Sequence, residues 1–250
     1  MVGMNEEIMI SDKPKSRNTP IPEIGRHIAK IRSSLGYTRA DLAKGIGVSL
    51  AQINDIENGR QNAKLERLDQ IADFLDVPTD YLLIVYHDDF INYAIDGYLY
   101  RIKPDVLTSV VTIMDEFVWA LQDEADASAT KDLFRKTAGT VAKPRKPLMT
   151  KDKFKLYRKE MGLSQAQFSK EIGMAYEHYV KYENNIAGAA LQTFLRICLF
   201  AKKSSECFTR PERLRLVLSE NQILLIQRLD RAKKIMLLEI LRTVYERTVK

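Results

Sequence analysis

Residues 48–58 place side chains that can hydrogen bond on one face of a short helical pattern. Val48, Ile53 and Ile56 take the spacing of a buried face. The residues left pointing away are Leu50, Ala51, Gln52, Asn54 and Asp55. Glutamine pairs with the edge of an adenine through two hydrogen bonds, and leucine or alanine contacts the methyl group of a thymine. These side chains are therefore candidates for contact with DNA bases, provided that the chain presents them on an exposed helix.

The other residue types that carry chemistry do not form the pattern of an enzyme or a metal site. The histidines lie beside no cysteine or carboxylate at ligand spacing, and they are far apart in the sequence, at His27, His87 and His178. The acidic pairs Asp88-Asp89 and Asp115-Glu116 have no partner motif, and the sequence contains no P-loop, GxGxxG, HExxH or GxSxG. We therefore expect no catalytic residue, no metal and no cofactor.

The composition is typical of a globular, mainly helical protein: 250 residues, of which 45% are hydrophobic and 29% charged, with only 11 Gly and 8 Pro. The formal net charge is +6, and the positive excess falls in the C-terminal half, which permits a polyanionic partner without requiring one. The longest apolar run, residues 81–86, is too short to span a membrane, and the N-terminus lacks a signal-peptide core. Two cysteines allow at most one disulfide, so the expected location is the reducing cytoplasm.

An internal duplication organises the chain. A shift of 126 residues lays residues 36–77 over residues 162–203 without a gap, and 11 of the 42 pairs are identical. Average residue usage would give about three identities by chance. The identical pairs include Gly47 with Gly173 and Glu57 with Glu183. Because the identities fall at turns and at helical core spacing, the two copies are predicted to share one fold.

Short helices are predicted in both copies from apolar spacing, caps and terminating glycines. In the first copy they cover residues 22–35, 39–44, 50–58, 64–75 and a short segment capped by Thr79. In the second copy the third and fourth helices cover residues 175–184 and 190–201. The caps of the second and third helices in the first copy are Thr38 and Ser49, and Thr150 and Ser164 cap the first and second helices of the second copy.

Two short helices joined by a glycine turn, the second beginning at a hydroxyl cap, form the helix-turn-helix pattern, in which the second helix enters the major groove. Residues 37–59 resemble the helix-turn-helix family of Cro and phage repressors, also called the xenobiotic-response-element (XRE) family, in the Gly-Val-Ser turn and the closing Ile-Glu-Asn-Gly. Residues 163–184 resemble it less fully, because Asn185 stands for the closing glycine and Tyr179 and Tyr182 stand for isoleucines. The resemblance implies two lambda-repressor-like domains and sequence-specific binding of double-stranded DNA, usually by a repressor or regulator of transcription.

The resemblance also extends the set of candidate DNA contacts. In the first copy it adds Ser49 to the reading helix and implies phosphate contacts at Arg39, Arg60, Asn62 and Lys64. In the second copy the corresponding residues are Gln165 at the phosphate position, Lys170 nearby, and Tyr176, Glu177, His178, Val180 and Lys181 on the reading helix. None of these reading residues matches its counterpart, so the copies either read different half-sites or only one of them reads sequence. Asp55 departs from the family pattern and residues 45–59 contain no cation, so we expect modest affinity from the first copy alone.

The segment between the copies, residues 84–149, is predicted to be more than a linker. Pro104 begins a helical pattern with a strongly apolar face, formed by Leu107, Val110, Met114, Phe117 and Leu121. This face must be covered, either by the two copies or by a second chain. Residues 128–147 are interpreted as a connection that ends in a basic, proline-flanked run, which is either a solvated linker or an arm for the minor groove.

The C-terminal segment is predicted to be a long helix. Ser219 and Gln222 form a capping box for this helix, which would cover residues 220–248 if it is continuous. Its apolar seam comprises Ile223, Ile226, Leu229, Met236, Leu237, Ile240, Leu241 and Val244. We expect this seam to join two copies of the chain, and packing within the chain over the second copy is the alternative.

The sequence as a whole predicts an all-α protein with two lambda-repressor-like helix-turn-helix domains joined by a helical middle segment, and a long C-terminal helix. The expected divisions are a tail over residues 1–20, the first domain over 21–83, the connecting segment over 84–149, the second domain over 150–208 and a dimerisation segment over 209–250. The expected function is that of a homodimeric transcriptional regulator that binds operator DNA, a repressor of bacterial, phage or mobile-element genes. The alternative is a protein-interaction module, such as an antitoxin or adaptor, in which one helix-turn-helix domain contacts protein. The sequence identifies no small-molecule effector.

Overall fold

The computed structural model describes residues 21–122, 153–184, 190–209 and 218–249. Within these ranges the chain forms fourteen α-helices and no strand, so the all-α prediction is confirmed. The helices enclose one hydrophobic core that draws on both copies of the duplication and on the segments between and after them. Among the described helices, none has the length and apolar character needed to span a bilayer.

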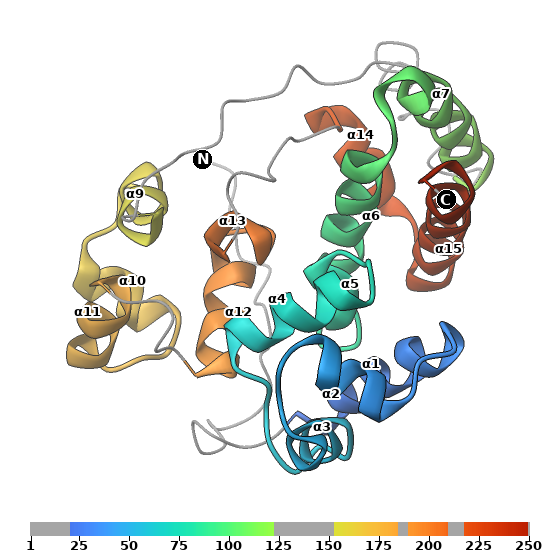
Figure 1. The fold of residues 1–250 in the computed structure, drawn as a ribbon. Coiled ribbons are helices and arrows are strands. Elements are labelled where there is room, and N and C mark those ends of the chain that lie inside the picture. The colour runs from blue at the N-terminus through green and yellow to red at the C-terminus, as the bar shows by residue number, and fades with distance from the viewer. Residues whose placement is uncertain (1–20, 123–152, 185–189, 210–217, 250) are drawn as a thin grey trace.

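The first copy of the duplication folds into five short helices, which we call the first module (Figure 1). Their bounds are α1 Pro22–Ser34, α2 Arg39–Gly45, α3 Leu50–Glu57, α4 Leu65–Phe74 and α5 Thr79–Leu83. The caps of α2 and α3 are those that the sequence predicts: Thr38 Oγ1 accepts a hydrogen bond from the amide of Asp41 at 3.1 Å, and Ser49 Oγ accepts one from the amide of Gln52 at 3.2 Å. Each satisfies an amide that the first helical turn leaves unpaired. The predicted cap Thr79 is instead the first residue of α5, and Pro78 takes the capping position.

Helix α1 crosses α3 at a very short distance because a glycine lies at the crossing. A Cβ atom built on Gly25 would lie 2.0 Å from the carbonyl oxygen of Ile56, so no other residue fits there without moving a helix. Gly59, which follows α3, has a φ of 68°, and a Cβ atom there would lie 2.6 Å from the Cα atom of Pro22. These two glycines therefore fix the position of α3 against the start of the module.

The second copy forms a second module of the same kind. Its helices are α9 Lys153–Glu160, α10 Gln165–Glu171, α11 Tyr176–Asn184, α12 Leu191–Phe200 and α13 Glu206–Thr209. Ser164 caps α10 in a capping box, in which Ser164 Oγ accepts from the amide of Gln167 and Gln167 Oε1 accepts from the amide of Ser164. The predicted cap Thr150, the residue Asn185 and the predicted connection over residues 128–147 lie outside the described residues.

Two helices follow the first module in the chain. Helix α6, Asp89–Arg101, was not predicted, and α7, Pro104–Ala120, begins at the proline that the sequence singled out. Helix α6 packs against α5 on one side and the C-terminal helix on the other. Val111, Met114 and Val118 of α7 are buried within the chain, and Gln222 of the C-terminal segment donates to Asp115 of α7 at 2.9 Å. Of the predicted apolar face of α7, Met114 is buried, whereas Leu107, Val110, Phe117 and Leu121 are half-buried against the core, so the chain itself covers this face in part.

The C-terminal segment is not one continuous helix, so that prediction was wrong. Helix α14, Glu220–Arg228, ends at Leu229, whose ψ of 142° is extended, and α15, Arg231–Val249, begins after Asp230. The carboxylate of Asp230 accepts a hydrogen bond from the amide of Lys233 at 2.9 Å. A carboxylate in this position satisfies an amide of a first helical turn, which favours a new helix start here. The chain therefore turns between α14 and α15.

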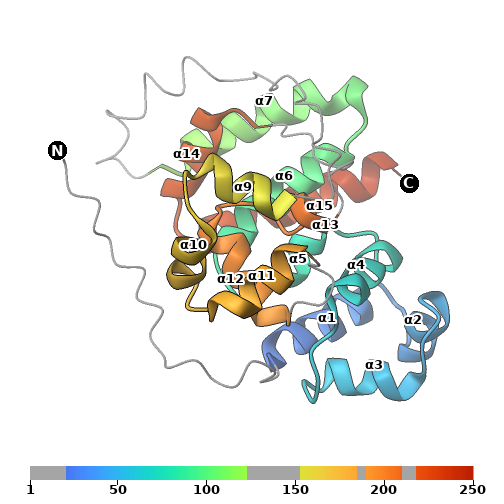
Figure 2. The same cartoon turned by 90° about the vertical axis from the view of Figure 1, so that its left-hand side faces the viewer.

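The apolar seam of the C-terminal segment is used within the chain. Leu237, Leu238 and Leu241 are buried, and α15 packs along α6, which lies next to it in Figures 1 and 2. Tyr245 of α15 donates a hydrogen bond to Asp76 at 2.9 Å, so α15 also contacts the first module. The alternative of packing over the second module is therefore not what the structure shows. Of the predicted seam, Met236 and Ile240 remain exposed.

Candidate nucleic-acid interface

A buried ion pair fixes α3 of the first module. Arg32 of α1 donates through Nε to Glu57 Oε1 at 2.6 Å and through Nη2 to Glu57 Oε2 at 2.9 Å. Arg39, the first residue of α2, donates to the second carboxylate oxygen at 2.7 Å. Arg32 also donates to the carbonyl oxygen of Tyr37, and its hydrogen bonds with Glu57 raise the pKa of its guanidinium. One carboxylate at the end of α3 thus ties together α1, α2 and α3.

The second module repeats this arrangement at equivalent positions. Arg158 of α9 donates to Glu183 at the end of α11 at 2.8 Å and to the carbonyl oxygen of Leu163 at 2.7 Å. Gln165, at the position equivalent to Arg39, donates to the other carboxylate oxygen of Glu183. The two glutamates lie within the repeat that begins at Gly36, whereas both arginines lie before it and were not predicted. The 126-residue shift already relates Arg32 to Arg158, so the signal was present in the sequence.

The outward face of α3 has the orientation that its spacing predicts. Ile53 and Ile56 are buried and Val48 is half-buried. Leu50 is 48% exposed, Ala51 is exposed, and Gln52, Asn54 and Asp55 are half-buried. We call these five residues the reading face of α3. The Asp55 carboxylate lies 3.4 Å from Nη1 of Arg60, so the one acidic group on this face has a cationic neighbour.

The candidate phosphate-contact residues beside α3 differ in their exposure and in their hydrogen bonds within the protein. The side chains of Arg60 and Arg39 are 71% and 42% exposed, although Arg39 also holds Glu57. Lys64 is exposed directly before α4. Asn62 accepts a hydrogen bond from the amide of Ile21 at 2.8 Å, so its amide oxygen supports the start of α1. Ser49 Oγ caps α3.

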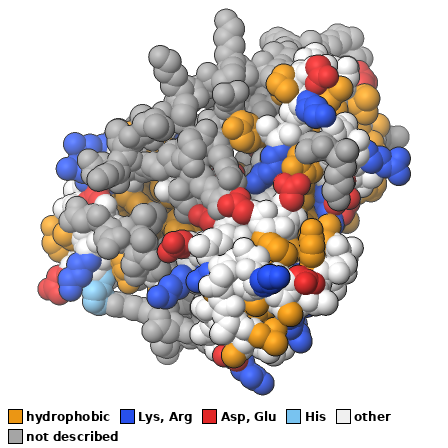
Figure 3. Space-filling view, viewed as in Figure 1, with side chains coloured by type: hydrophobic (Ala, Val, Ile, Leu, Met, Phe, Trp, Pro, Cys, Tyr) orange, Lys and Arg blue, Asp and Glu red, His pale blue; other side chains and the backbone are white. Residues whose placement is uncertain are grey.

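The second module presents a different chemistry on α11. Tyr176 is 50% exposed, Glu177 and Lys181 are exposed, and His178 and Val180 are half-buried. The hydroxyl of Tyr176 donates to Gln165 at 3.5 Å, and Lys170 is exposed on α10. Figure 3 shows basic and acidic side chains and a histidine on the surface over α10 and α11. This face combines an aromatic ring with charges of both signs.

Tyr179 explains how the second module tolerates an aromatic residue in place of an isoleucine. It occupies the position equivalent to Ile53, is fully buried, and packs against Phe168 with 5.1 Å between the ring centroids. Burial raises the pKa of its hydroxyl. The tyrosine is therefore a core residue of the module and not a candidate for DNA contact.

Comparison with protein families finds a model that matches this chain at two places. The model described as "Helix-turn-helix" matches residues 28–82 and residues 154–205. These ranges contain α2 and α3 of the first module and α10 and α11 of the second. Comparison with curated proteins and with solved structures gives no match.

Proposed function

We propose that this chain, which carries two helix-turn-helix domains of the Cro and phage-repressor type, is a sequence-specific transcriptional regulator that binds double-stranded DNA. The observation that carries the proposal is the reading face of α3. It is exposed at Leu50, it offers the amides of Gln52 and Asn54, and it is held rigidly by the Arg32–Glu57 pair. A rigid helix with amide and apolar side chains is suited to the major groove, where base edges differ in their donors, acceptors and methyl groups.

In this proposal, flanking side chains position the reading helix on the DNA backbone. Arg60 and Lys64 follow α3 and are exposed, so they are placed to neutralise phosphates beside the groove. Arg39 contributes from the start of α2, where its side chain is partly exposed although Nε holds Glu57. Such contacts fix orientation and add affinity, whereas the reading face supplies the discrimination between sequences.

We propose repression as the mode of regulation. A protein that occupies an operator within a promoter excludes other proteins from the same DNA, and this requires nothing beyond binding. The proposal is tested in a reporter strain in which the chain is expressed beside its selected DNA site. Lower reporter output with the wild-type chain, and not with Gln52→Ala, is the expected result. Higher reporter output with the wild-type chain would contradict repression and indicate activation.

The test of DNA binding is selection of bound duplexes from a random library by the full chain, followed by affinity measurement at stated salt concentrations. We expect one motif to be enriched and to bind at least about 10³-fold more tightly than random DNA. If no sequence is enriched, the proposed function is wrong.

A protein-interaction role for the second module is the second candidate. The observation that favours it is Tyr176, an aromatic side chain 50% exposed at the start of α11, next to the acidic Glu177. Tyrosine is common in protein interfaces, whereas a carboxylate repels phosphate. In this case Tyr176→Ala would abolish co-purification of a protein partner and leave the selected DNA motif unchanged.

A further inference from the structure

We infer that the two modules of one chain form an internal pair with pseudo-two-fold symmetry and that the DNA target is a single bipartite, non-palindromic site read by both modules of one chain. The inference rests on the proposed function for its DNA part. Its structural part rests on contacts between α5 of the first module and the start of α13 of the second.

These contacts are reciprocal. The amide of Thr79 donates to Glu206 Oε1 at 3.1 Å, and the amide of Ser205 donates to Asp80 Oδ1 at 2.9 Å. The 126-residue shift relates Thr79 to Ser205 and Asp80 to Glu206. The carboxylate at this position of each module therefore accepts a hydrogen bond from a backbone amide at the start of the other module's fifth helix. Contacts of this kind, in which the same two positions exchange partners, are the mark of a two-fold relation.

The reciprocal contacts lie inside the protein. Thr79, Asp80, Ser205 and Glu206 are each at most 4% exposed. A buried carboxylate that loses its partner is strongly unfavourable, so these contacts favour one fixed arrangement of the modules. Arg101 of α6 lies 3.5 Å from Glu206 and adds a cation to the pair.

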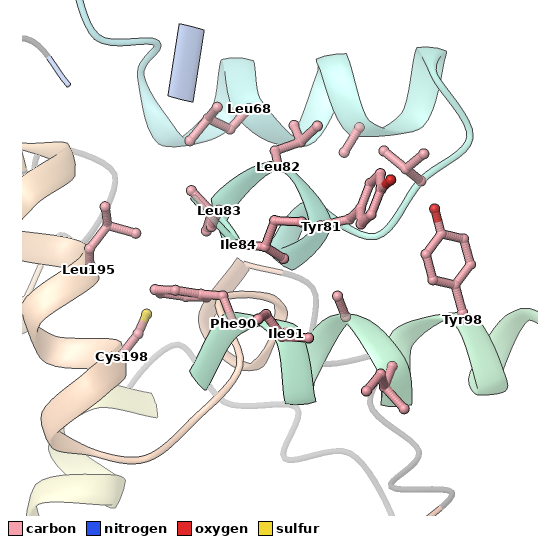
Figure 4. Packing of buried hydrophobic residues seen from close by; sticks show 14 of the residues in the cluster. Leu68, Tyr81, Leu82, Leu83, Ile84, Phe90, Ile91, Tyr98, Leu195 and Cys198 are labelled. Carbon is pink, nitrogen blue, oxygen red and sulfur yellow. The ribbon is translucent and has the colours of Figure 1, made fainter. Parts of the chain in front are cut away.

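Apolar packing extends the same interface. Phe90 of α6 and Leu83 of α5 lie opposite Leu195 and Cys198 of α12 (Figure 4). All four side chains are fully buried. The described parts of the modules are thus joined by a continuous core.

The pairing leaves both recognition helices available. Leu50 on α3 and Tyr176 on α11 are about half exposed, and in Figures 1 and 2 both helices lie away from α7. A two-fold relation presents two such helices to one duplex in equivalent ways, as two subunits do on a palindrome. Here the equivalent residues differ, since Gln52 corresponds to His178 and Asp55 to Lys181. One rigid chain with two unlike reading faces fits a site with two unlike halves.

The pairing is tested without DNA by hydrogen exchange. Glu206→Ala removes the acceptor of the Thr79 amide, so we expect exchange at Thr79 to become at least about tenfold faster, although the substitution is in the other module. Asp80→Ala should do the same at Ser205. Glu206→Gln keeps an acceptor oxygen and should retain protection, and Glu171→Ala, an exposed change in the second module, is the control. Unchanged exchange at Thr79 in Glu206→Ala would overturn the pairing.

The DNA part is tested on the selected duplex by native mass spectrometry and affinity measurements. We expect one chain per duplex and a motif with two unlike halves, of which Gln52→Ala relaxes one and His178→Ala the other. Five base pairs inserted between the halves should lower affinity by about 10²-fold, because the second half then faces the opposite side of the helix. Two chains on a palindrome, or affinity independent of the insertion, would overturn the inference and leave the proposed function intact. Failure to enrich any motif would overturn both, whereas hydrogen exchange would still decide the pairing.

Discussion

Glu183 lies 2.8 Å from Nε of Arg158, in the same relation that Glu57 has to Arg32 one copy earlier in the chain. The carboxylate side chains of Glu57 and Glu183 are essentially inaccessible to solvent. In both modules the pair joins the first helix to the end of the recognition helix. The two copies therefore share the contact that holds the third helix of the module, whereas the outward-facing residues of α3 and α11 differ.

The first prediction concerns this pair. Glu57→Ala leaves the guanidinium of Arg32 buried without its carboxylate, so we expect the free energy of unfolding to fall by about 3–5 kcal/mol. Urea unfolding of the full chain measures it. Glu23→Ala is the control, because Glu23 pairs with Arg26 at 2.9 Å on an exposed surface and such pairs contribute at most about 1 kcal/mol. Equal effects of the two substitutions would contradict the role of the buried pair.

The reading face of α3 gives the second prediction. Gln52→Ala and Leu50→Ala should each weaken binding to the selected DNA by about 1–3 kcal/mol while binding to random DNA stays nearly the same. Fluorescence anisotropy at fixed salt measures both affinities. Glu116→Ala, an exposed change on α7, should alter neither. If both variants on α3 discriminate as well as the wild type, α3 does not read bases.

The third prediction separates phosphate contacts from base contacts. Replacing Arg60 and Lys64 by alanine should lower the slope of log affinity against log salt by up to about one per contact, because fewer counterions are released on binding. Lys103→Ala removes an exposed cation outside the proposed surface and should leave the slope unchanged. A slope that is the same in all variants means that neither Arg60 nor Lys64 touches the backbone.

The fourth prediction concerns pH. Burial, followed by the nearby charge of Glu206, raises the pKa of Asp80 to about 7. The folded state then holds a proton that the unfolded chain releases near pH 4, so stability falls as pH rises from about 4 to about 7 and this contribution is constant above that range. The loss is at most about 4 kcal/mol. Arg101, Cys198 and Cys207 also lie near these carboxylates.

Urea unfolding across this pH range tests the assignment. Asp80→Asn cannot take up the proton, so its stability should vary less between pH 4 and pH 7 than that of the wild type. Asp105→Asn changes an exposed carboxylate on α7 and serves as the control. The same pH dependence in Asp80→Asn and the wild type would assign the effect to other groups.

The fifth prediction separates the residues of α15 that stabilise the fold from those that could contact a second copy of the chain. Leu241 is buried on the side of α15 that faces the chain, so Leu241→Ala should lower stability by about 2–5 kcal/mol. Met236 and Ile240 are exposed on the same helix, and their replacement by serine should change stability little. Light scattering of the wild type and of that double variant tests the homodimer expected from the sequence against the single chain per duplex inferred above. A mass lowered from dimer to monomer would place a second copy on this face.

The local features of the fold could be predicted from the sequence, and the long-range ones could not. Thr38, Ser49 and Ser164 act within three residues of themselves, so their type and spacing were enough to place helix starts. Helix α6 escaped prediction because partners on two sides bury much of it, which blurs the amphipathic pattern of a surface helix. The break at Leu229 was missed because the apolar spacing continues across it, and its only local signal is Asp230, whose carboxylate accepts a hydrogen bond from the amide of Lys233.

At the candidate site, too, the local features could be predicted from the sequence and the long-range contacts could not. The outward direction of Leu50 followed from helical spacing, and the structure places that side chain as the spacing predicts. The contact that holds α3 joins Arg32 to Glu57 over 25 residues, and the contact between the modules joins Thr79 to Glu206 over 127 residues. No periodicity within one helix contains such information. A comparison of the two copies carried back beyond Gly36 would have found the arginines, but not the exchange between modules.

The packing of α15 on α6 has a consequence for how the protein is made. Tyr98 and Ile95 of α6 are buried in a core that α15 completes, yet the whole second module is synthesised between these helices. At the usual rate of translation α15 leaves the ribosome on the order of ten seconds after α6. During that interval the apolar side of α6 is exposed because α15 has not yet been synthesised. We therefore expect chaperones to bind the nascent chain until α15 emerges.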